Sequence, residues 1–369
     1  MKLTPLYNTH LSLGAEMIKT SAGYLMPAHY RPIEEEHLAV RERVGMMDIS
    51  LMARIDIKGS GSLNYIQKLA ANDARKLKDD QLLYTTLCNE QGKIMDDLTV
   101  WRFSDDHFRI VTSSVMRYKT MKWLQDHLPE REVYLTDISP SLGMIAVQGP
   151  YSRKLLQKLS DTNLDSVKFF HFARAKLNGV PSILARVGFT GELGFECYFG
   201  AEDTVDAWNT IHDAGKEFGI LPYGFDVLDT LRFEKGYIFY GYEVTEENNP
   251  FECGLEKWVA FDKEDNFLGR EALLRVRERG PERKLMGLEV ESEGIVSEKQ
   301  PVRAGGQFAG ETVYGFKGLT IGKNIAWAWL RSEFAQEGKK VEIDDKGNRK
   351  EATIVNIRYY DPNGKRMRA

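Results

Sequence analysis

The sequence predicts an α+β fold that ends in a small, mostly β domain, and three observations support this prediction. Between residues 53 and 138, and again between residues 140 and 235, strand-like segments are interleaved with segments of helical spacing. From about residue 283 onward, apolar segments of strand length are separated by turns such as Gly305-Gly306. The chain has 369 residues, more than one ordinary core holds, so two or three domains are expected.

The first 50 residues predict a loop-rich entry followed by a helix from Ile33 to Val44. Glu34 to Glu36 fall in the first turn of this helix, where negative charge opposes the helix macrodipole. Gly45 is the expected end of the helix. His29 and His37 lie in this region, but no ligand cluster follows them, so we expect no metal site.

The next section, residues 51–138, alternates strand and helix patterns. Apolar residues recur at helical spacing between Gly61 and Ala71 and return to it between Met116 and His127. Alternation predicts strands in four segments: Ala53–Lys58, Gln81–Leu87, Ile94–Phe103 and His107–Thr112.

The section from residue 140 to residue 235 repeats this mixture. The expected strands are Gly143–Gln148 and Val180–Val187, and the expected helices are Ser152–Leu159, Thr204–Phe218 and Val227–Glu234. The second strand runs into Gly188–Glu196, whose three glycines permit a sharp turn or a close backbone approach. Their spacing matches neither standard phosphate-binding loop.

Two adjacent carboxylates stand where a turn becomes a strand, within Asn89–Trp101. Side chains alternate between the two faces of a strand, so Asp96 and Asp97 must point in opposite directions. Only one of them can therefore face a shared pocket. A carboxylate directed inward is costly unless a partner stabilises it, which makes this pair either a turn cap with a solvated neighbour or a functional site.

Composition excludes several classes of function. The net charge of -4 is small and no basic stripe is present, so nucleic-acid binding is not expected. No segment approaches the ~20 apolar residues that span a bilayer, and the N-terminus lacks an apolar signal core. Cys88, Cys197 and Cys253 are far apart and show neither metal spacing nor a disulfide framework, which is typical of a cytoplasmic protein.

An ordered set of segments resembles the folate-dependent aminomethyltransferase family. That family includes the T-protein of the glycine cleavage system and tetrahydrofolate-dependent demethylases. Each segment alone is weak evidence for membership of the family, but together the segments cover nearly the whole chain. The segments that carry the resemblance are Thr4–Tyr7, Met26–Tyr30, Glu36–Arg41, Met47–Ser50, Asp96–Leu98, Ile145–Pro150, Gly188–Glu196, Asp229–Gly236 and Phe267–Leu273.

The resemblance implies a three-domain cloverleaf around a central channel that holds tetrahydrofolate as the acceptor. Residues 1–50 with 139–240 would form the first α+β, folate-binding domain. Residues 51–138 with 241–280 would form the second α+β domain, which carries the strand with the two aspartates. Residues 283–369 would form a barrel-like C-terminal domain.

Site residues also follow from the resemblance. Asp96 matches the catalytic carboxylate near the reactive folate nitrogens, and Glu196 matches the carboxylate that reads the pterin ring. A carboxylate suits the latter task because it can accept two N–H bonds from an aminopyrimidine edge. Arg232 matches an Arg near the folate, where its planar fork can bind carboxylate. Tyr84 is a candidate for packing against the ligand.

Departures from the T-protein pattern direct the prediction of function towards the demethylases. Ser50-Leu51-Met52 replaces the usual Ser-His-Met, Gly92-Lys93 replaces two glycines, and Leu228 stands where an Arg is common. Tyr314–Leu319 replaces the Ser-Gly and Ser-Pro signature of the last domain, whereas Asn249–Gly254 looks more like the demethylase branch.

We therefore expect a tetrahydrofolate-dependent methyltransferase that demethylates a small O-, N- or S-methylated compound. Tyr24, Trp101, Tyr237 and Tyr240 are candidates for a substrate wall, which would attract a cationic donor through cation–π contacts, although core packing is the more common role for any single one of them. One alternative is a T-protein that takes an aminomethyl group from a lipoylated carrier protein. A second alternative, of a different class, is a folate-binding protein without catalytic activity.

Overall fold

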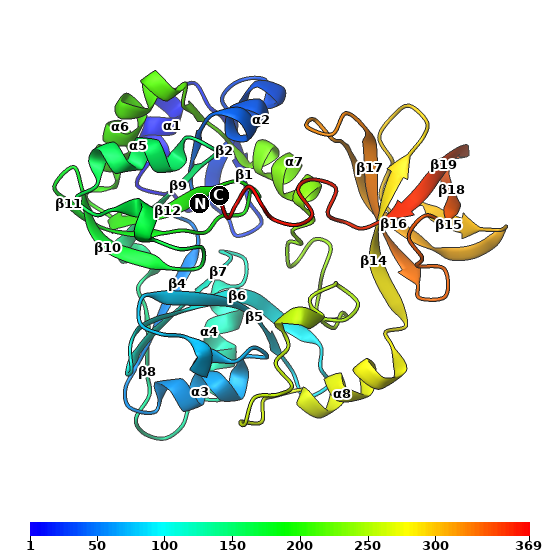
Figure 1. The fold of residues 1–369 in the computed structure, drawn as a ribbon, viewed down its shortest axis with the longest axis horizontal. Helices are drawn as coiled ribbons and strands as arrows, with labels where there is room; N and C mark the ends of the chain where they lie inside the picture. Colours follow the sequence, from blue (N-terminus) through cyan, green and yellow to red (C-terminus); the bar gives the residue numbers. More distant parts are fainter.

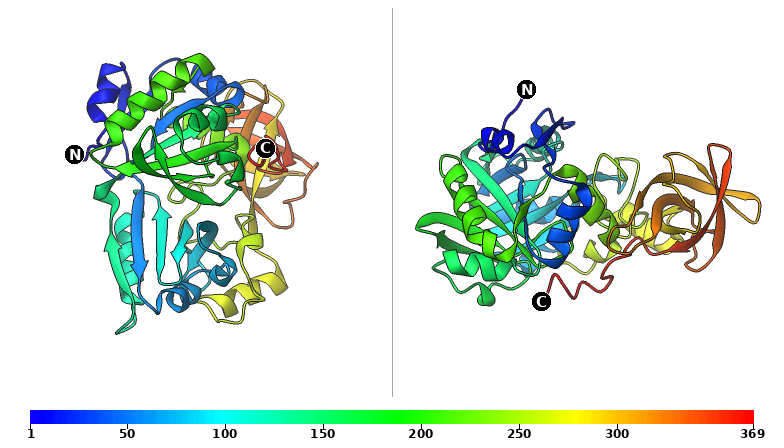
Figure 2. Two further views of the ribbon diagram at one scale, coloured as in Figure 1. Left: turned by 60° about the vertical axis from the view of Figure 1, so that its left-hand side comes forward. Right: turned by 90° about the horizontal axis from the view of Figure 1, so that it is seen from above.

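The computed structural model describes residues 1–369 and confirms an α+β architecture with a C-terminal barrel (Figure 1). A six-stranded sheet, a five-stranded sheet and a closed barrel occupy three corners of the molecule. The barrel, drawn in orange, stands at one end of the elongated molecule when it is seen from above (Figure 2). None of the helices combines the length and the apolar character that a membrane-spanning helix requires.

The six-stranded sheet is covered on one face by helices α5 (Ser152–Leu159) and α6 (Thr204–Gly215). Phe195, Cys197 and Phe199 alternate along one strand into the core beneath these helices. Glu196 and Tyr198 therefore point to the opposite face. In sheet order, the strands are β10 (Phe172–Leu177), β11 (Val180–Ala185), β12 (Gly194–Gly200), β9 (Leu142–Gln148), β3 (Gly45–Asp48) and β13 (Leu221–Pro222).

The five-stranded sheet packs against helices α3 (Ser62–Leu69) and α4 (Arg117–Asp126). Leu98 and Val100 of its second strand lie in the core with Ile66 of α3 and Leu124 of α4. This face of the strand is therefore the helix-covered one. In sheet order, the strands are β5 (Gln81–Cys88), β6 (Ile94–Ser104), β7 (His107–Thr112), β4 (Ala53–Lys58) and β8 (Tyr134–Asp137).

The uncovered faces of these two sheets pack against each other. Trp101 of β6 lies 5.1 Å from the ring of Tyr198 on β12 and 5.0 Å from that of Phe172 on β10. These three residues belong to one buried cluster between the sheets. Because side chains alternate along β6, Asp97 lies on the same face as Trp101. This face of the five-stranded sheet, the second sheet, is turned towards the six-stranded sheet, the first sheet, and we call it the inner face.

The N-terminal segment adds helix α1 (Tyr7–Ser12) and the hairpin of β1 (Glu16–Lys19) and β2 (Leu25–His29). Helix α2 (Ile33–Glu42) follows and packs against α7 (Phe225–Lys235). Glu36 lies in the first turn of α2, where its charge opposes the helix macrodipole, and its side chain also makes hydrogen bonds. Its buried carboxylate accepts hydrogen bonds from the backbone N–H groups of residues 30, 31 and 224, which fastens the start of α2 to α7.

The C-terminal barrel is closed, and helix α8 (Arg270–Arg279) leads into it. After the last strand the chain returns to the first sheet, where the carbonyl of Ala369 accepts hydrogen bonds from Arg153 and Arg186. Tyr360 anchors this tail by donating its hydroxyl hydrogen to Glu192 at 2.6 Å. The barrel strands, in order, are β14 (Arg283–Val290), β17 (Asn324–Arg331), β16 (Gln307–Lys317), β15 (Pro301–Ala304), β18 (Lys340–Asp345) and β19 (Asn348–Val355).

One apolar cluster joins all three corners. It includes Ile94 of β6, Phe233 of α7, Leu285 of β14 and Trp327 of β17. The rings of Phe233 and Trp327 stack with their centroids 4.2 Å apart. The six-stranded sheet takes its strands from residues 45–48 and 142–222, and the five-stranded sheet takes its strands from residues 53–137. We propose three domains centred on these sheets, with the boundaries given above for the sequence.

Candidate active site

Asp97 lies on the face of β6 that is turned away from the helices, and it is held by a neighbouring tyrosine. Tyr84 on β5 donates its hydroxyl hydrogen to Oδ2 of Asp97 at 2.8 Å. The strand register pairs Asp97 with Thr86 and pairs Tyr84 with Thr99, so Tyr84 and Asp97 are diagonal neighbours on one face. Oδ1 of Asp97 has no hydrogen-bond partner in the protein, and the side chain is only partly exposed.

Asp96 lies on the opposite face, as the alternation predicts, but that face is the helix-covered one. Its Oδ2 accepts hydrogen bonds from Thr112 of β7, at 2.7 Å, and from Thr120 of α4. Asp96 is 1% exposed, and its Oδ1 is buried without a partner. Assigning Asp96 to the inner side of the strand was therefore wrong, because α4 covers this face of β6.

Both carboxyl groups have raised pKa values, and the charge of Asp97 contributes to that of Asp96. Burial raises the pKa of Asp97 to about 6; the hydrogen bond from Tyr84 opposes this rise and the charge of Glu243 adds to it. Burial also raises the pKa of Asp96 to about 7, the charge of Asp97 adds to it, and the two threonine hydroxyls oppose it. Near neutral pH, Asp97 is consequently the more ionised member of the pair.

Glu196 lies on β12, on the side of the first sheet that is turned towards β6. Its only hydrogen bond within the protein is a long one, 3.4 Å, from the hydroxyl of Tyr198. Burial raises the pKa of Glu196 to about 7. This carboxylate is thus desolvated and retains unused acceptor capacity, which fits a ligand that presents N–H donors.

Arg232 is placed differently from the sequence-based expectation. It is 1% exposed, and Glu243 accepts a hydrogen bond of 2.6 Å from it. It also donates to Asp229, to the carbonyl of Tyr237 and to the hydroxyl of Tyr314. Four of its five N–H donors are therefore used inside the protein, which leaves little capacity to bind a folate carboxylate.

The four aromatic residues proposed as a substrate wall do not form one surface. Trp101 lies in the core between the two sheets, and Tyr240 is buried with its hydroxyl donating to the carbonyl of Ile94. Tyr24 sits at the N-terminal hairpin, where the ammonium of Lys2 lies 5.3 Å from its ring centroid. Tyr237, whose ring stacks on that of Phe189 with centroids 5.5 Å apart, remains the candidate for contact with a ligand.

Glu243 is a functional candidate that the sequence did not reveal. Its side chain is fully buried, it pairs with Arg232, and its charge contributes to the raised pKa of Asp97. The segment around it, Gly241–Val244, shows no motif or periodicity that marks a buried carboxylate. Its role follows only from the way residues 237–244 fold back beneath α7 and against the barrel, where Trp329 donates its indole N–H to the carbonyl of Glu243.

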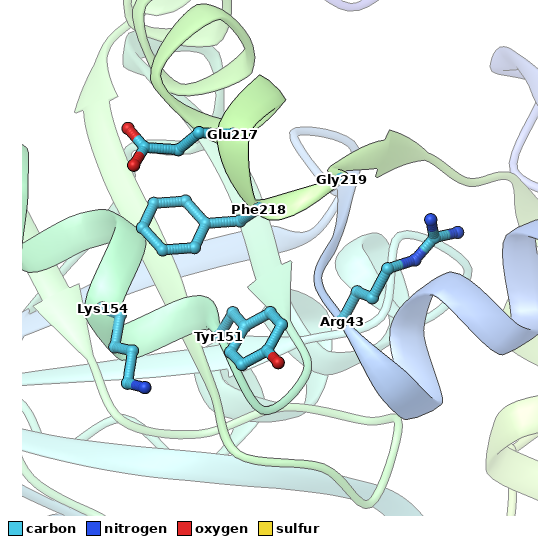
Figure 3. Close-up of a pocket in the computed structure, with 6 residues that line it drawn as sticks. All are labelled: Arg43, Tyr151, Lys154, Glu217, Phe218 and Gly219. Carbon is cyan, nitrogen blue, oxygen red and sulfur yellow. The ribbon is translucent and has the colours of Figure 1, made fainter.

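Neither a metal-binding group nor the surface hollow described here coincides with this site. No group of three or more His, Cys, Asp or Glu side chains is arranged to hold a metal ion. A hollow of about 540 Å³ is lined by Arg43, Tyr151, Lys154, Glu217, Phe218 and Gly219 (Figure 3). None of these residues is among the predicted site residues, and the hollow lies on the outer, helix-covered side of the first sheet.

Comparisons with known proteins agree with the architecture. The GCVT N-terminal domain family matches residues 6–263, and the glycine cleavage T-protein C-terminal barrel domain family matches residues 283–361. The crystal structure of glycine cleavage system aminomethyltransferase T from Bartonella henselae superimposes with a TM-score of 0.90, at 23% identity, over 98% of both chains. At that identity the likeness shows a shared fold.

Curated relatives are more similar in sequence. The aminomethyltransferase of Thermoanaerobacter pseudethanolicus is 39% identical over 367 residues, which covers 99% of each chain. The aminomethyltransferase of a Geobacillus species, strain WCH70, is 37% identical over 361 residues, which covers 98% of this chain and 99% of its own. These matches extend over the whole of both proteins.

The comparisons correct the predicted reaction. The full-length relatives are aminomethyltransferases, so the demethylase interpretation was wrong and the T-protein alternative is the better supported one. The substitutions at Leu51, Lys93 and Leu228 therefore do not place the chain in the demethylase branch. Two family matches and full-length relatives above 30% identity establish that the chain belongs to the glycine cleavage T-protein family of tetrahydrofolate-dependent one-carbon transferases.

Proposed function

We propose that this protein is an aminomethyltransferase that takes a one-carbon unit from an aminomethyl group on the lipoyl arm of a carrier protein. The acceptor is tetrahydrofolate. The proposal is supported by the full-length similarity to proteins called aminomethyltransferase. The observation that carries it is the partly accessible carboxylate of Asp97, held by Tyr84 on the inner face of the second sheet.

The residues present fit the folate. Glu196 has acceptor capacity that no protein group uses, and it is desolvated, so the N–H groups of an aminopyrimidine ring would stabilise its ionised form. Tyr237 and Phe189 supply stacked rings suited to an aromatic ligand. When bound, tetrahydrofolate supplies nucleophilic nitrogens that accept the one-carbon unit.

Asp97 is suited to manage a proton during this transfer. A carboxyl group with a pKa of about 6 is close enough to neutral pH to exist in both protonation states. In its ionised form it stabilises positive charge that develops nearby, and in its protonated form it can give a proton to a departing amine nitrogen. Tyr84 fixes the orientation of the carboxylate, because its hydroxyl stays protonated: burial raises its pKa well above the usual value, and the charge of Asp97 adds to this rise.

A reconstituted assay tests the proposal. The substrate is a lipoylated carrier protein whose reduced arm bears an aminomethyl group, and the acceptor is tetrahydrofolate. We expect equimolar release of ammonia and appearance of methylenetetrahydrofolate, measured by mass spectrometry of the folate. The matched control is the same carrier without its lipoyl group. If the folate product forms equally well with that control, or does not form at all with the loaded carrier, the proposal fails.

A further inference from the structure

A fully buried arginine without a carboxylate partner lies where the two sheets meet. Arg41, Arg54 and Arg232 are each at most 2% exposed. Arg41 and Arg232 form salt bridges with buried glutamates, whereas no aspartate or glutamate pairs with Arg54, which lies on β4. A buried charge that lacks a counter-charge is strongly unfavourable, so the environment of Arg54 differs energetically from that of the other two arginines.

Hydrogen bonds within the protein use less than half of the donors of Arg54. Its Nη2 donates to the carbonyls of Ser139 and Leu142, the latter at 2.9 Å. Its Nε and Nη1 are buried and have no hydrogen-bond partner, and these two nitrogens carry three of the five N–H donors. Burial lowers the pKa of Arg54 to about 10, so the guanidinium remains charged at neutral pH.

A second guanidinium, that of Arg109, lies beside the first. In the register of β4 and β7, Arg54 is paired with Val111 and Asp56 is paired with Arg109, so the two arginines are diagonal neighbours on one face. This face is the inner one, because Arg109 is also paired with Trp101 of β6. Arg109 is 7% exposed and donates from Nε to Asp56 at 2.7 Å, but its Nη1 is buried without a partner.

Tyr198 of the first sheet lies close to both guanidinium groups. Burial raises the pKa of Tyr198 well above the usual value, and the charges of Arg54 and Arg109 oppose this rise. The ring of Tyr198 packs against that of Trp101 in the buried apolar cluster between the sheets. The two arginines therefore lie beside an apolar region that excludes water, where an electrostatic interaction is stronger than at the surface.

The carboxylates near Arg54 are already paired with other cations. Asp56 binds Arg109, and Asp137, on the strand that pairs with β4, accepts a hydrogen bond of 2.7 Å from Arg117. These five groups comprise three positive and two negative charges, so one positive charge is left without a counter-charge. That charge belongs to Arg54, because the other two arginines each have a carboxylate partner.

We propose that a small monovalent anion of the size of chloride binds beside Arg54 and Arg109 and stabilises the contact between the two sheets. A single-atom anion accepts N–H bonds from any direction, so it can pair with donors that two different strands supply. A larger oxyanion would be repelled by the carbonyl oxygens of Ser139 and Leu142, which already lie at the guanidinium of Arg54. Since Arg54 of the second sheet donates to Leu142 of the first, neutralising its charge strengthens a link between the sheets.

Thermal unfolding in buffers that differ only in the anion tests this proposal. The wild-type protein would be compared in sodium gluconate, whose anion is too large for the site, and in sodium chloride or sodium bromide at the same ionic strength. We expect the halides to raise the Tm by about 2 °C or more, because they bind the folded state only. Arg54→Met removes the guanidinium but keeps an unbranched side chain, and its Tm should be the same in gluconate and in halide.

The matched control is Arg174→Gln, which should keep the halide effect. Arg174 is 59% exposed and paired with Asp80, and its guanidinium carbon lies 5.6 Å from the ring centroid of Phe103, the ring that Arg109 approaches to 4.7 Å. This variant therefore removes an arginine charge from the same region but not from the proposed site. A wild-type Tm that does not depend on the anion, or an Arg54→Met variant that keeps the halide effect, would overturn the inference.

A direct measurement decides the question even if Arg54→Met does not fold. Crystals of the wild-type protein grown in sodium bromide should show an anomalous scattering peak in contact with Nη1 of Arg54. Bromide peaks at exposed cations alone would identify adventitious ions and overturn the inference, as would the absence of any peak. Aminomethyl transfer is measured separately in the reconstituted assay, so neither result bears on the proposed function.

Discussion

The hydroxyl of Tyr84 donates a 2.8 Å hydrogen bond to Oδ2 of Asp97, across the β5–β6 pair and on the inner face of the second sheet. Because of this bond and the contacts of Asp96, the two adjacent carboxylates have different environments and different roles. Asp97 keeps one free oxygen on the inner face, whereas Asp96 is fixed between β7 and α4 by two threonine hydroxyls. The predictions below follow from this separation and from the buried charges around it.

Replacing each aspartate by asparagine should affect turnover very differently. Asp97→Asn removes the ionisable group of the inner face and should lower kcat by about 10²-fold or more, the range typical of a positioned acid–base or electrostatic group. Asp96→Asn keeps the acceptor that Thr112 and Thr120 use, and should lower kcat less than about 10-fold. Steady-state kinetics on both folded variants, with the same carrier and folate, make the comparison. A larger loss for Asp96→Asn would return the catalytic role to that residue.

Asp97→Asn should also stabilise the protein at alkaline pH. The pKa of Asp97 is about 6 in the folded state, above the usual carboxyl value of about 4, so folded protein holds this proton longer than unfolded protein does. Stability is therefore lost as the pH rises from about 4 to about 6, and the loss persists above this range. The variant lacks this ionisable group, so its free energy of unfolding should exceed that of the wild-type protein by on the order of 1–2 kcal/mol at pH 8 and by about half of this at pH 5. Chemical denaturation at both pH values checks this, with the exposed Asp344→Asn as the control.

Glu196→Gln should weaken folate binding without unfolding the protein. The substitution replaces one acceptor oxygen by an N–H donor that would face the donors of the pterin. Loss of such a paired contact costs about 1–3 kcal/mol, or roughly 5- to 150-fold in Kd. Titration calorimetry with tetrahydrofolate measures the change, and Glu202→Gln, an exposed acid just beyond β12, is the matched control. Unchanged affinity in Glu196→Gln would remove this residue from the folate site.

Glu243→Gln should be strongly destabilising. It leaves the buried guanidinium of Arg232 without its closest counter-charge, at a cost of about 3–5 kcal/mol. Asp229→Asn removes the other, half-exposed partner of the same Arg232 and should cost less than about 1 kcal/mol. Urea denaturation of both variants measures the two costs. If the two variants prove equally stable, Arg232 is not held as described and is free to act on the ligand.

Activity should not depend on a metal ion. The described residues contain no group of three or more side chains that could hold one. Turnover in the reconstituted assay should survive dialysis against a strong chelator, with the carrier protein treated separately as a control. A stoichiometric transition metal in the purified protein, together with activity lost on its removal, would contradict this prediction.

Much of the fold could be read from local patterns. The period of two in Ile94–Phe103 and the helical spacing in Ser152–Leu159 depend on neighbours in the chain, and β6 and α5 form where those patterns predict them. The alternation of side chains along a strand also predicts that Asp96 and Asp97 point to opposite faces, because this depends on strand geometry alone. The family, and with it the folate acceptor, followed from ordered motifs.

The identity of the inner face was decided only by tertiary structure. A strand has two faces that its own sequence does not label when both carry apolar residues, as Leu98 and Trp101 do here. The packing of α4 on one face and of the first sheet on the other placed Asp96 outside the site and Asp97 inside it. Likewise, the sequence alone suggests that the guanidinium of Arg232 is free to bind a ligand. In the structure, the hydroxyl of Tyr314, 82 positions away in the chain, accepts one of its hydrogen bonds. Contacts of this range depend on how the domains pack, which no local pattern encodes.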